Sequence, residues 1–281
     1  QVSQQLRLED LLGFRKNPIT STPLFVQFNA KPLDGHPTPQ TPFVWLSTGV
    51  SGVGVAASTG LALTLKDMYG EDAPKVHILE GEGGMTPGRV AESLAAAATS
   101  GLDNIIFHLD WNQASIDSEL VTREGNKAGD YVQWDPCDLL LVQGFNVIYV
   151  PDGFDFAQIR EAQEKALAMN NGRPTGIVYR TVKGWKYGME GAQSHGAGHG
   201  FYSEEYLQAL QPFEQAFGLK FPRFEGEKTP ERIEQAYYDS LMVIRKAFES
   251  KPALTQQLGD WIAASKQEHE GLARHIHSDA P

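Results

Sequence analysis

The sequence contains only one cysteine, Cys137, among its 281 residues. A single thiol excludes an intramolecular disulfide and a zinc site built from several thiolates, and it favours a reducing compartment, so we expect a cytoplasmic protein. Cys137 follows Asp135-Pro136 in a segment that we interpret as turn-rich, and no partner residue suggests a nucleophilic role.

Positive charge is also scarce. The chain has 24 lysines and arginines against 35 aspartates and glutamates, a net charge of −11, and it has no basic run. Binding to nucleic-acid backbones needs clustered positive charge, so nucleic acid is not an expected partner. Long apolar runs are absent as well, and the N-terminal QVSQQLRLED has no signal-peptide pattern, so we expect no membrane association.

The middle of the chain alternates short β-rich runs with longer helical patterns. The expected strands are residues 75–80, 105–110, 146–150 and 175–182, and the expected helices are 49–70, 86–100 and 155–172. This alternation predicts an α/β fold with a doubly wound, mostly parallel sheet flanked by helices. Residues 201–281 read as a helical C-terminal extension in which Thr229 caps a helix, so we expect an α/β domain over 1–200 followed by this extension.

The segment Gly81-Glu82-Gly83-Gly84 lies between an expected strand and an expected helix. Glycines there expose backbone N–H groups at a helix N-terminus, where a phosphate can bind, and Glu82 could hold a divalent cation. Asn112 ends the next strand, and the carboxyl ends of parallel strands share one edge, so both side chains could bind Mg²⁺ or Ca²⁺. The alternative is an ordinary tight turn in which Glu82 caps the helix.

The segment GEGGMTPGRVAESLAAAATSGLDNIIFHLDWNQASID resembles the thiamine-diphosphate motif of the transketolase-like family, which opens with Gly-Asp-Gly and closes with asparagine. Further similar motifs occur in the family's order: LEDLLGFR (8–15), which looks like its leucine-rich helix, DGHP (34–37), TPFVWLSTGVSGVG (41–54), PDGFDFAQIREAQEKAL and RPTGIVYRTVKGW. The resemblance covers residues 8–200.

This resemblance implies thiamine diphosphate and Mg²⁺ as cofactors. The implied metal ligands are the side chains of Glu82 and Asn112 and the carbonyl of Ala114. The implied cofactor-binding residues are Gly49, Ser51, Gly52, Gly81, Gly83, Gly84 and Asn112. The implied catalytic residues are His36 and His195, and His199 competes for the second position.

The sequence departs from the family pattern at two positions of the motif. Glu82 replaces aspartate, which adds a methylene, and Pro87 replaces a glutamate that links paired active sites. The family's upstream segments and its whole second half are also missing. Either a second chain supplies the pyrimidine-binding and C-terminal domains, in an assembly with two copies of each chain, or the sequence is a piece of a longer chain.

The leading hypothesis is therefore the diphosphate- and Mg²⁺-binding half of a transketolase-like transferase of carbohydrate metabolism, moving a two-carbon ketol unit between sugar phosphates. The segment KGWKYGMEG also resembles the pyruvate-dehydrogenase-like branch, which makes a 2-oxo acid decarboxylating subunit an alternative. Glu82 and Pro87 leave a non-catalytic cofactor-binding or scaffold subunit as a further alternative.

Overall fold

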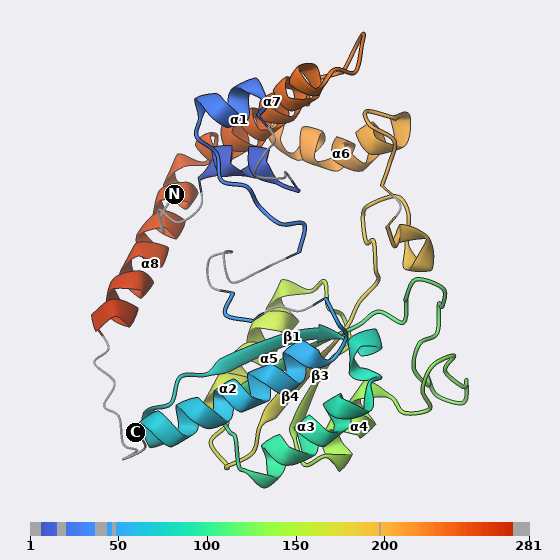
Figure 1. Cartoon of the computed structure of the whole chain (residues 1–281), viewed down its shortest axis with the longest axis vertical. Helices are drawn as coiled ribbons and strands as arrows, with labels where there is room; N and C mark the ends of the chain where they lie inside the picture. Colours follow the sequence, from blue (N-terminus) through green and yellow to red (C-terminus); the bar gives the residue numbers. More distant parts are fainter. Residues whose placement is uncertain (1–6, 16–20, 37–43, 47–48, 197, 272–281) are drawn as a thin grey trace. The chain divides into compact units, whose positions relative to one another are not determined.

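The computed structural model describes residues 7–15, 21–36, 44–46, 49–196 and 198–271. Contacts divide the chain into two compact units (Figure 1). We call the described residues from 49 to 198 the sheet unit, and the described residues up to 46 together with those from 199 to 271 the helical unit.

The sheet unit is built on four parallel strands in the order β1-β2-β4-β3. Their bounds are Val76–Gly81 (β1), Ile105–Trp111 (β2), Asn146–Val150 (β3) and Thr175–Arg180 (β4). The register pairs Gly81 with Asp110, and Asp110 with Tyr179. The turns that follow β1, β2 and β4 therefore lie along one edge of the sheet, and the predicted parallel sheet is confirmed.

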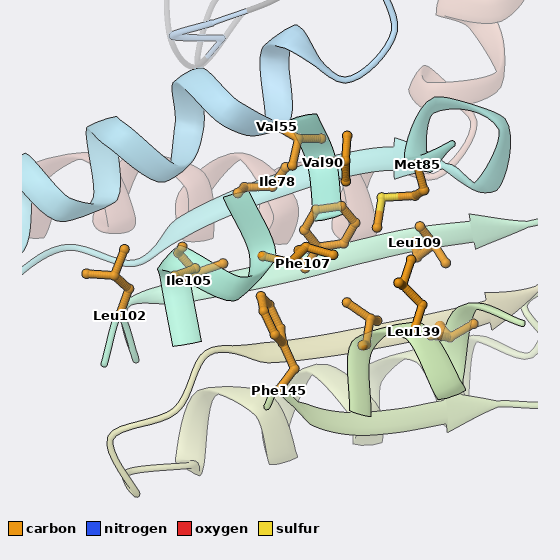
Figure 2. Packing of buried hydrophobic residues seen from close by; sticks show 14 of the residues in the cluster. Val55, Ile78, Met85, Val90, Leu102, Ile105, Phe107, Leu109, Leu139 and Phe145 are labelled. Atoms are coloured by element: carbon orange, nitrogen blue, oxygen red, sulfur yellow. The ribbon is translucent and has the colours of Figure 1, made fainter. Parts of the chain in front are cut away.

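Helices cover both faces of the sheet. On one face, α2 (Val53–Tyr69), α3 (Gly88–Thr99) and α4 (Pro136–Val142) pack on a core centred on Phe107, which is fully buried (Figure 2). On the other face, α5 (Phe156–Ala168) packs on Ile106 and its neighbours. Adjacent residues of β2 lie on opposite faces because strand side chains alternate, so Phe107 and Ile106 belong to different buried clusters. The predicted doubly wound arrangement is confirmed.

Cys137 lies in helix α4 rather than in the turn that we expected. The Asp135 carboxylate accepts a hydrogen bond of 2.9 Å from the amide of Asp138, and Pro136 occupies the first helical turn. An Asp-Pro pair is as suitable for starting a helix as for making a turn, which explains the error. Burial raises the pKa of the Cys137 thiol to about 11, so the thiol stays protonated and unreactive at neutral pH.

The helical unit joins the N-terminal residues to the C-terminal helices. It contains the short 3-10 helix η1 (Leu8–Gly13), α1 (Pro23–Gln27), α6 (Glu204–Phe217), α7 (Pro230–Glu249) and α8 (Pro252–Gly271). Leu12 and Ala30 share a buried cluster with Leu241 of α7. The leucine-rich segment forms η1 rather than an α-helix, and Thr229 caps α7 as predicted, accepting a hydrogen bond of 3.4 Å from the amide of Arg232.

Glu234 of α7 fastens α1 within the helical unit. It is 4% exposed, and its carboxylate accepts hydrogen bonds from the amides of Leu24 (2.9 Å) and Phe25 (3.1 Å) and from the Thr22 hydroxyl. We expect Glu234→Gln to lower the free energy of unfolding by about 1–3 kcal/mol, because its NH₂ group would face other donors. Urea unfolding measures the change. Glu231→Gln, on the exposed face of the same helix, should change stability by less than about 0.5 kcal/mol, and equal effects would contradict the assignment.

Candidate functional site

Glu82 connects the turn after β1 to the turn after β2. It begins the short 3-10 helix η3 (Glu82–Met85) and is only 1% exposed. Its Oε2 accepts a hydrogen bond of 3.2 Å from the backbone amide of Asn112. The structure therefore brings Glu82 and Asn112 together at the carboxyl edge of the sheet, which is where parallel α/β folds bind ligands.

Among the described residues, the Glu82 carboxylate has no cationic partner. Burial raises its pKa to about 7, and the negative charge of Asp110 adds to the increase, whereas backbone N–H groups of Glu82, Asn112 and Gln113 oppose it. None of the described ion pairs includes Glu82. A buried carboxyl group of this kind favours a bound cation, because the cation would compensate the charge that burial penalises.

The Asn112 side chain is oriented by its neighbours in the chain. Its Nδ2 donates to Oδ2 of Asp110 (3.0 Å), and its Oδ1 accepts from the amide of Ala114 (2.9 Å). The hydroxyl of Thr181, just after β4, donates to the other oxygen of Asp110. An amide oxygen has two lone pairs, so Oδ1 keeps one for a metal ion. Our sequence reasoning missed Asp110, although an acidic residue near the end of an apolar strand is a recognisable signal.

The donor set at this edge fits Mg²⁺ bound together with a diphosphate. Glu82, Asn112 and the Ala114 carbonyl would provide oxygen ligands only, which Mg²⁺ prefers. In the part of the chain that the structure describes, no three His, Cys, Asp or Glu side chains gather as a metal site. The protein would thus supply one carboxylate, and the remaining ligands would come from phosphate oxygens and water, as is usual for Mg²⁺.

Some glycines near this edge have open space beside them, and others are packed against neighbouring residues. A Cβ atom added at Gly49 or Gly83 would meet no described atom within 4 Å, so a ligand could approach the backbone closely there. Gly84 lies against the Glu80 carboxylate, and Gly81 pairs with Asp110 in the sheet.

Gly52 caps α2 with a φ of +77° and packs against Val90 and Pro87 of the α3 N-terminal region. Ser51 beside it is exposed.

The packing of Gly52 leads to a testable difference between two glycines of the same turn. In Gly52→Ala the new Cβ would lie 2.6 Å from Cγ2 of Val90 in a left-handed backbone conformation, so we expect a loss of about 2 kcal/mol or more in unfolding free energy. Gly49→Ala should change it by less than about 0.5 kcal/mol. Chemical denaturation of both variants checks this, and a harmless Gly52→Ala would contradict the packing.

His195 is linked to the same edge through Lys183. The Lys183 ammonium lies 2.9 Å from Nδ1 of His195 and 3.2 Å from the carbonyl oxygen of Ser115, in the loop that follows Asn112. An ammonium can only donate, so Nδ1 accepts, and the proton of the neutral ring is on Nε2. The Glu119 carboxylate accepts from the Ala192 amide (2.8 Å) in η4 (Gly191–Ser194), which attaches the His195 segment to that loop a second time.

The two other candidate histidines belong to the helical unit. His36 is exposed and follows a turn in which the Asp34 carboxylate accepts from the amide of Gly35 (2.7 Å). His199 is the first residue of the C-terminal part of that unit. Their roles stay predictions from the resemblance.

These features define a parallel α/β protein with a buried carboxylate and a glycine turn at the carboxyl edge of its sheet, where such folds bind ligands. Residues 3–281 match the family described as transketolase, thiamine diphosphate binding domain. The chain belongs to this family.

Curated relatives agree with the assignment. The chain is 35% identical over 152 residues to transketolase-like protein 2 of Mus musculus, covering 54% of this chain and 23% of that protein. It is 30% identical over 172 residues to Homo sapiens transketolase, covering 60% and 25% respectively. It is 32% identical over 187 residues to dihydroxyacetone synthase of Candida boidinii, covering 63% and 25%. The chain thus spans about a quarter of the length of these relatives.

Solved structures show the same fold. Transketolase from Leishmania mexicana superimposes with a TM-score of 0.61 at 25% identity, covering 94% of this chain and 36% of that chain. Transketolase from Campylobacter jejuni gives a TM-score of 0.58 at 26% identity, covering 89% of this chain and 37% of that chain.

Among the described residues, no helix combines the length and apolarity needed to span a bilayer.

Proposed function

We propose that this chain is the diphosphate- and Mg²⁺-binding half of a transketolase-like enzyme that transfers a two-carbon ketol unit between sugar phosphates. The observation that carries the proposal is the buried Glu82 carboxylate, hydrogen-bonded to Asn112 beside a glycine turn, in a chain of this family. The names of the relatives, transketolase and dihydroxyacetone synthase, support ketol transfer as the reaction.

Each proposed role uses a group at the carboxyl edge. Glu82, Asn112 and the Ala114 carbonyl would hold Mg²⁺, with Ca²⁺ as a possible substitute. The glycines Gly81, Gly83 and Gly84 would offer amides to the diphosphate, and Gly49, Ser51 and Gly52 would line the cofactor. When bound, thiamine diphosphate supplies a centre that stabilises a carbanion, and the protein provides orientation and charge.

His195 is the proposed proton carrier of the sheet unit. With Nδ1 accepting from the Lys183 ammonium, its Nε2–H would donate a hydrogen bond to a substrate oxygen. Transfer of that proton would be balanced if the ammonium passed a proton to Nδ1, and both proton shifts would run backward in the reverse step. His36 is proposed as a second histidine facing the substrate, and His199 remains the competitor of His195.

We also propose that an α/β domain over residues 1–200 is followed by a helical extension over residues 201–281.

The proposal includes further domains because the chain spans only about a quarter of its relatives. The pyrimidine-binding and C-terminal domains would belong to a second polypeptide or to a longer chain of which this sequence is a piece, and the assembly would hold two copies of each chain. The single cysteine is the support for the proposed cytoplasmic location.

One observation favours a second candidate, a cofactor-binding or scaffold subunit without turnover. The Glu82 carboxylate already accepts backbone hydrogen bonds from the loop after β2, so it can stabilise that loop without a metal. A pyruvate-dehydrogenase-like decarboxylating subunit also stays an alternative, based on the sequence KGWKYGMEG.

Native mass spectrometry of the untagged protein from its source, followed by assays of the purified assembly, separates these candidates. The proposal expects a second chain or a longer form of this chain, bound thiamine diphosphate with Mg²⁺, and ketol transfer from a ketose phosphate. Turnover of a 2-oxo acid without ketol transfer would support the decarboxylase. Bound cofactor without turnover by any assembly would support the scaffold subunit.

A further inference from the structure

Gln113 has an unusual backbone conformation between two residues of the proposed metal site. It is one of the non-glycine residues with a positive φ, +66°, and it is 4% exposed. A side chain in this left-handed region costs energy that glycine would not. Glutamine at this position therefore costs free energy of folding, and we expect its side chain to make an interaction that glycine could not make.

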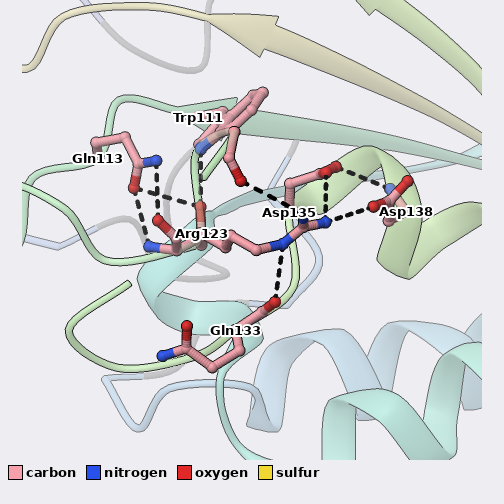
Figure 3. Close-up of polar contacts among 8 residues, drawn as sticks. Trp111, Gln113, Arg123, Gln133, Asp135 and Asp138 are labelled. Atoms are coloured by element: carbon pink, nitrogen blue, oxygen red, sulfur yellow. Dashed lines mark hydrogen bonds and ion pairs between the residues drawn. The ribbon is translucent and has the colours of Figure 1, made fainter. Parts of the chain in front are cut away.

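The side chain of Gln113 pairs with both polar groups of one backbone unit. Its Oε1 accepts from the amide of Thr122 (2.9 Å), and its Nε2 donates to the carbonyl of Thr122 (3.1 Å), as Figure 3 shows. The indole N–H of Trp111 donates to the Thr122 hydroxyl (3.0 Å). Thr122 is fully buried, so water does not reach its polar groups. Losing these hydrogen bonds would leave the groups unpaired, which costs free energy of folding.

Arg123, the residue after Thr122, makes a second set of contacts. The Arg123 guanidinium donates from Nε to the carbonyl of Gln133 (3.0 Å) and from Nη2 to the carboxylate of Asp138 (2.7 Å) near the start of α4 (Figure 3). The same group forms an ion pair with Asp135, the cap of α4. The loop after β2 is therefore closed on itself by Gln113 and attached to a helix by Arg123.

We propose that Gln113 is a positioning residue for the metal and diphosphate site, an inference that rests on the proposed function. Its side-chain amide fixes the left-handed turn between Asn112, whose backbone amide donates to Glu82, and Ala114, whose amide donates to Oδ1 of Asn112. Gln113 would thereby hold the two proposed ligands beside the Glu82 carboxylate. Only a side-chain amide satisfies both Thr122 groups. A carboxylate cannot donate to the carbonyl, and glycine would leave both groups unpaired.

The test compares Gln113→Gly, Gln113→Glu and the control Gln133→Gly in the protein purified with any partner chain. Gln133 lies in the same loop and is exposed, and its side chain donates to the carbonyl of Gly129. Its backbone carbonyl, which accepts from Arg123, is kept in the variant. The first readout is amide hydrogen exchange without metal or cofactor. The second is the Mg²⁺ concentration that gives half-maximal binding of thiamine diphosphate.

Both Gln113 variants should exchange about tenfold faster at Ala114 and Thr122, with protection in β1 and β2 unchanged, and should need roughly 10–100 times more Mg²⁺. Gln133→Gly should match the wild type in both readouts. Uniformly faster exchange through the sheet unit would overturn the proposal in favour of a general structural role, and unchanged Mg²⁺ dependence would overturn it as well. If the wild-type protein binds no thiamine diphosphate, the proposed function fails, and the role of Gln113 at a cofactor site fails with it. Unaltered hydrogen exchange in the Gln113 variants would separately overturn the control of the loop by Gln113.

Discussion

Replacing Glu82 by alanine is expected to weaken Mg²⁺-dependent binding of thiamine diphosphate by a factor on the order of 100 or more. The substitution removes the only carboxylate that we assign to the metal, and substitutions that merely reorient ligands already cost 10–100-fold. Asn112 and Ala114 would also lose their anchor, because the Asn112 amide donates to Glu82. Isothermal titration with thiamine diphosphate at fixed Mg²⁺ measures the loss.

Two further variants sharpen this prediction. Glu82→Gln keeps the size and the hydrogen-bond acceptor but removes the charge, so it should lose nearly as much affinity as alanine while remaining folded. Glu82→Asp restores the family's residue and should bind at least as tightly as the wild type. Glu92, exposed on α3, provides the control, since Glu92→Ala should leave binding unchanged. Equal affinities of the alanine variant and the wild type would remove Glu82 from the metal site.

The second large effect is a pH dependence of stability that originates from Glu82. Its pKa is about 7 in the folded chain, against an ordinary value of 4.5. The folded state therefore binds more protons than the unfolded state between these values, and stability from this group falls as the pH rises from about 4.5 to about 7. The difference in pKa corresponds to about 3 kcal/mol in unfolding free energy.

Urea unfolding of the wild type and Glu82→Gln across this pH range measures the effect, because contributions from other groups cancel in the comparison. The wild type should lose stability relative to the variant as the pH rises, with no further change above about pH 8. Saturating Mg²⁺ and thiamine diphosphate should reduce this loss, since the cation favours the ionised carboxylate. A difference that does not vary with pH would show that Glu82 has an ordinary pKa.

The sheet could be predicted from sequence because its signals are local. Each strand is a short β-rich run bounded by glycine or polar residues, and the glycine turn after β1 separates it from the periodic pattern of α3. Helix α4 was missed because Asp135-Pro136 suits a turn as well as a helix start. The pairing of Leu12 with Leu241 could not be predicted, because no local pattern records contacts between distant segments.

The same distinction applies to the candidate site. Glu82 and Asn112 could be placed together because parallel strands align their carboxyl ends. Asp110, Gln113 and the link from Lys183 to His195 depend on register and loop closure, which only the structure shows. The sequence offered one unused signal, since polar residues directly beside an expected ligand often orient it.

We propose above all that Glu82, Asn112 and Ala114 hold the metal of a bound thiamine diphosphate. A crystal structure of the assembly with thiamine diphosphate and Mn²⁺, whose anomalous signal locates the metal, tests it most directly. We expect one metal site bonded to the Glu82 carboxylate, Oδ1 of Asn112 and the Ala114 carbonyl, with the diphosphate at the Gly83-Gly84 turn. A cofactor bound elsewhere, or a metal that does not contact Glu82, would contradict it.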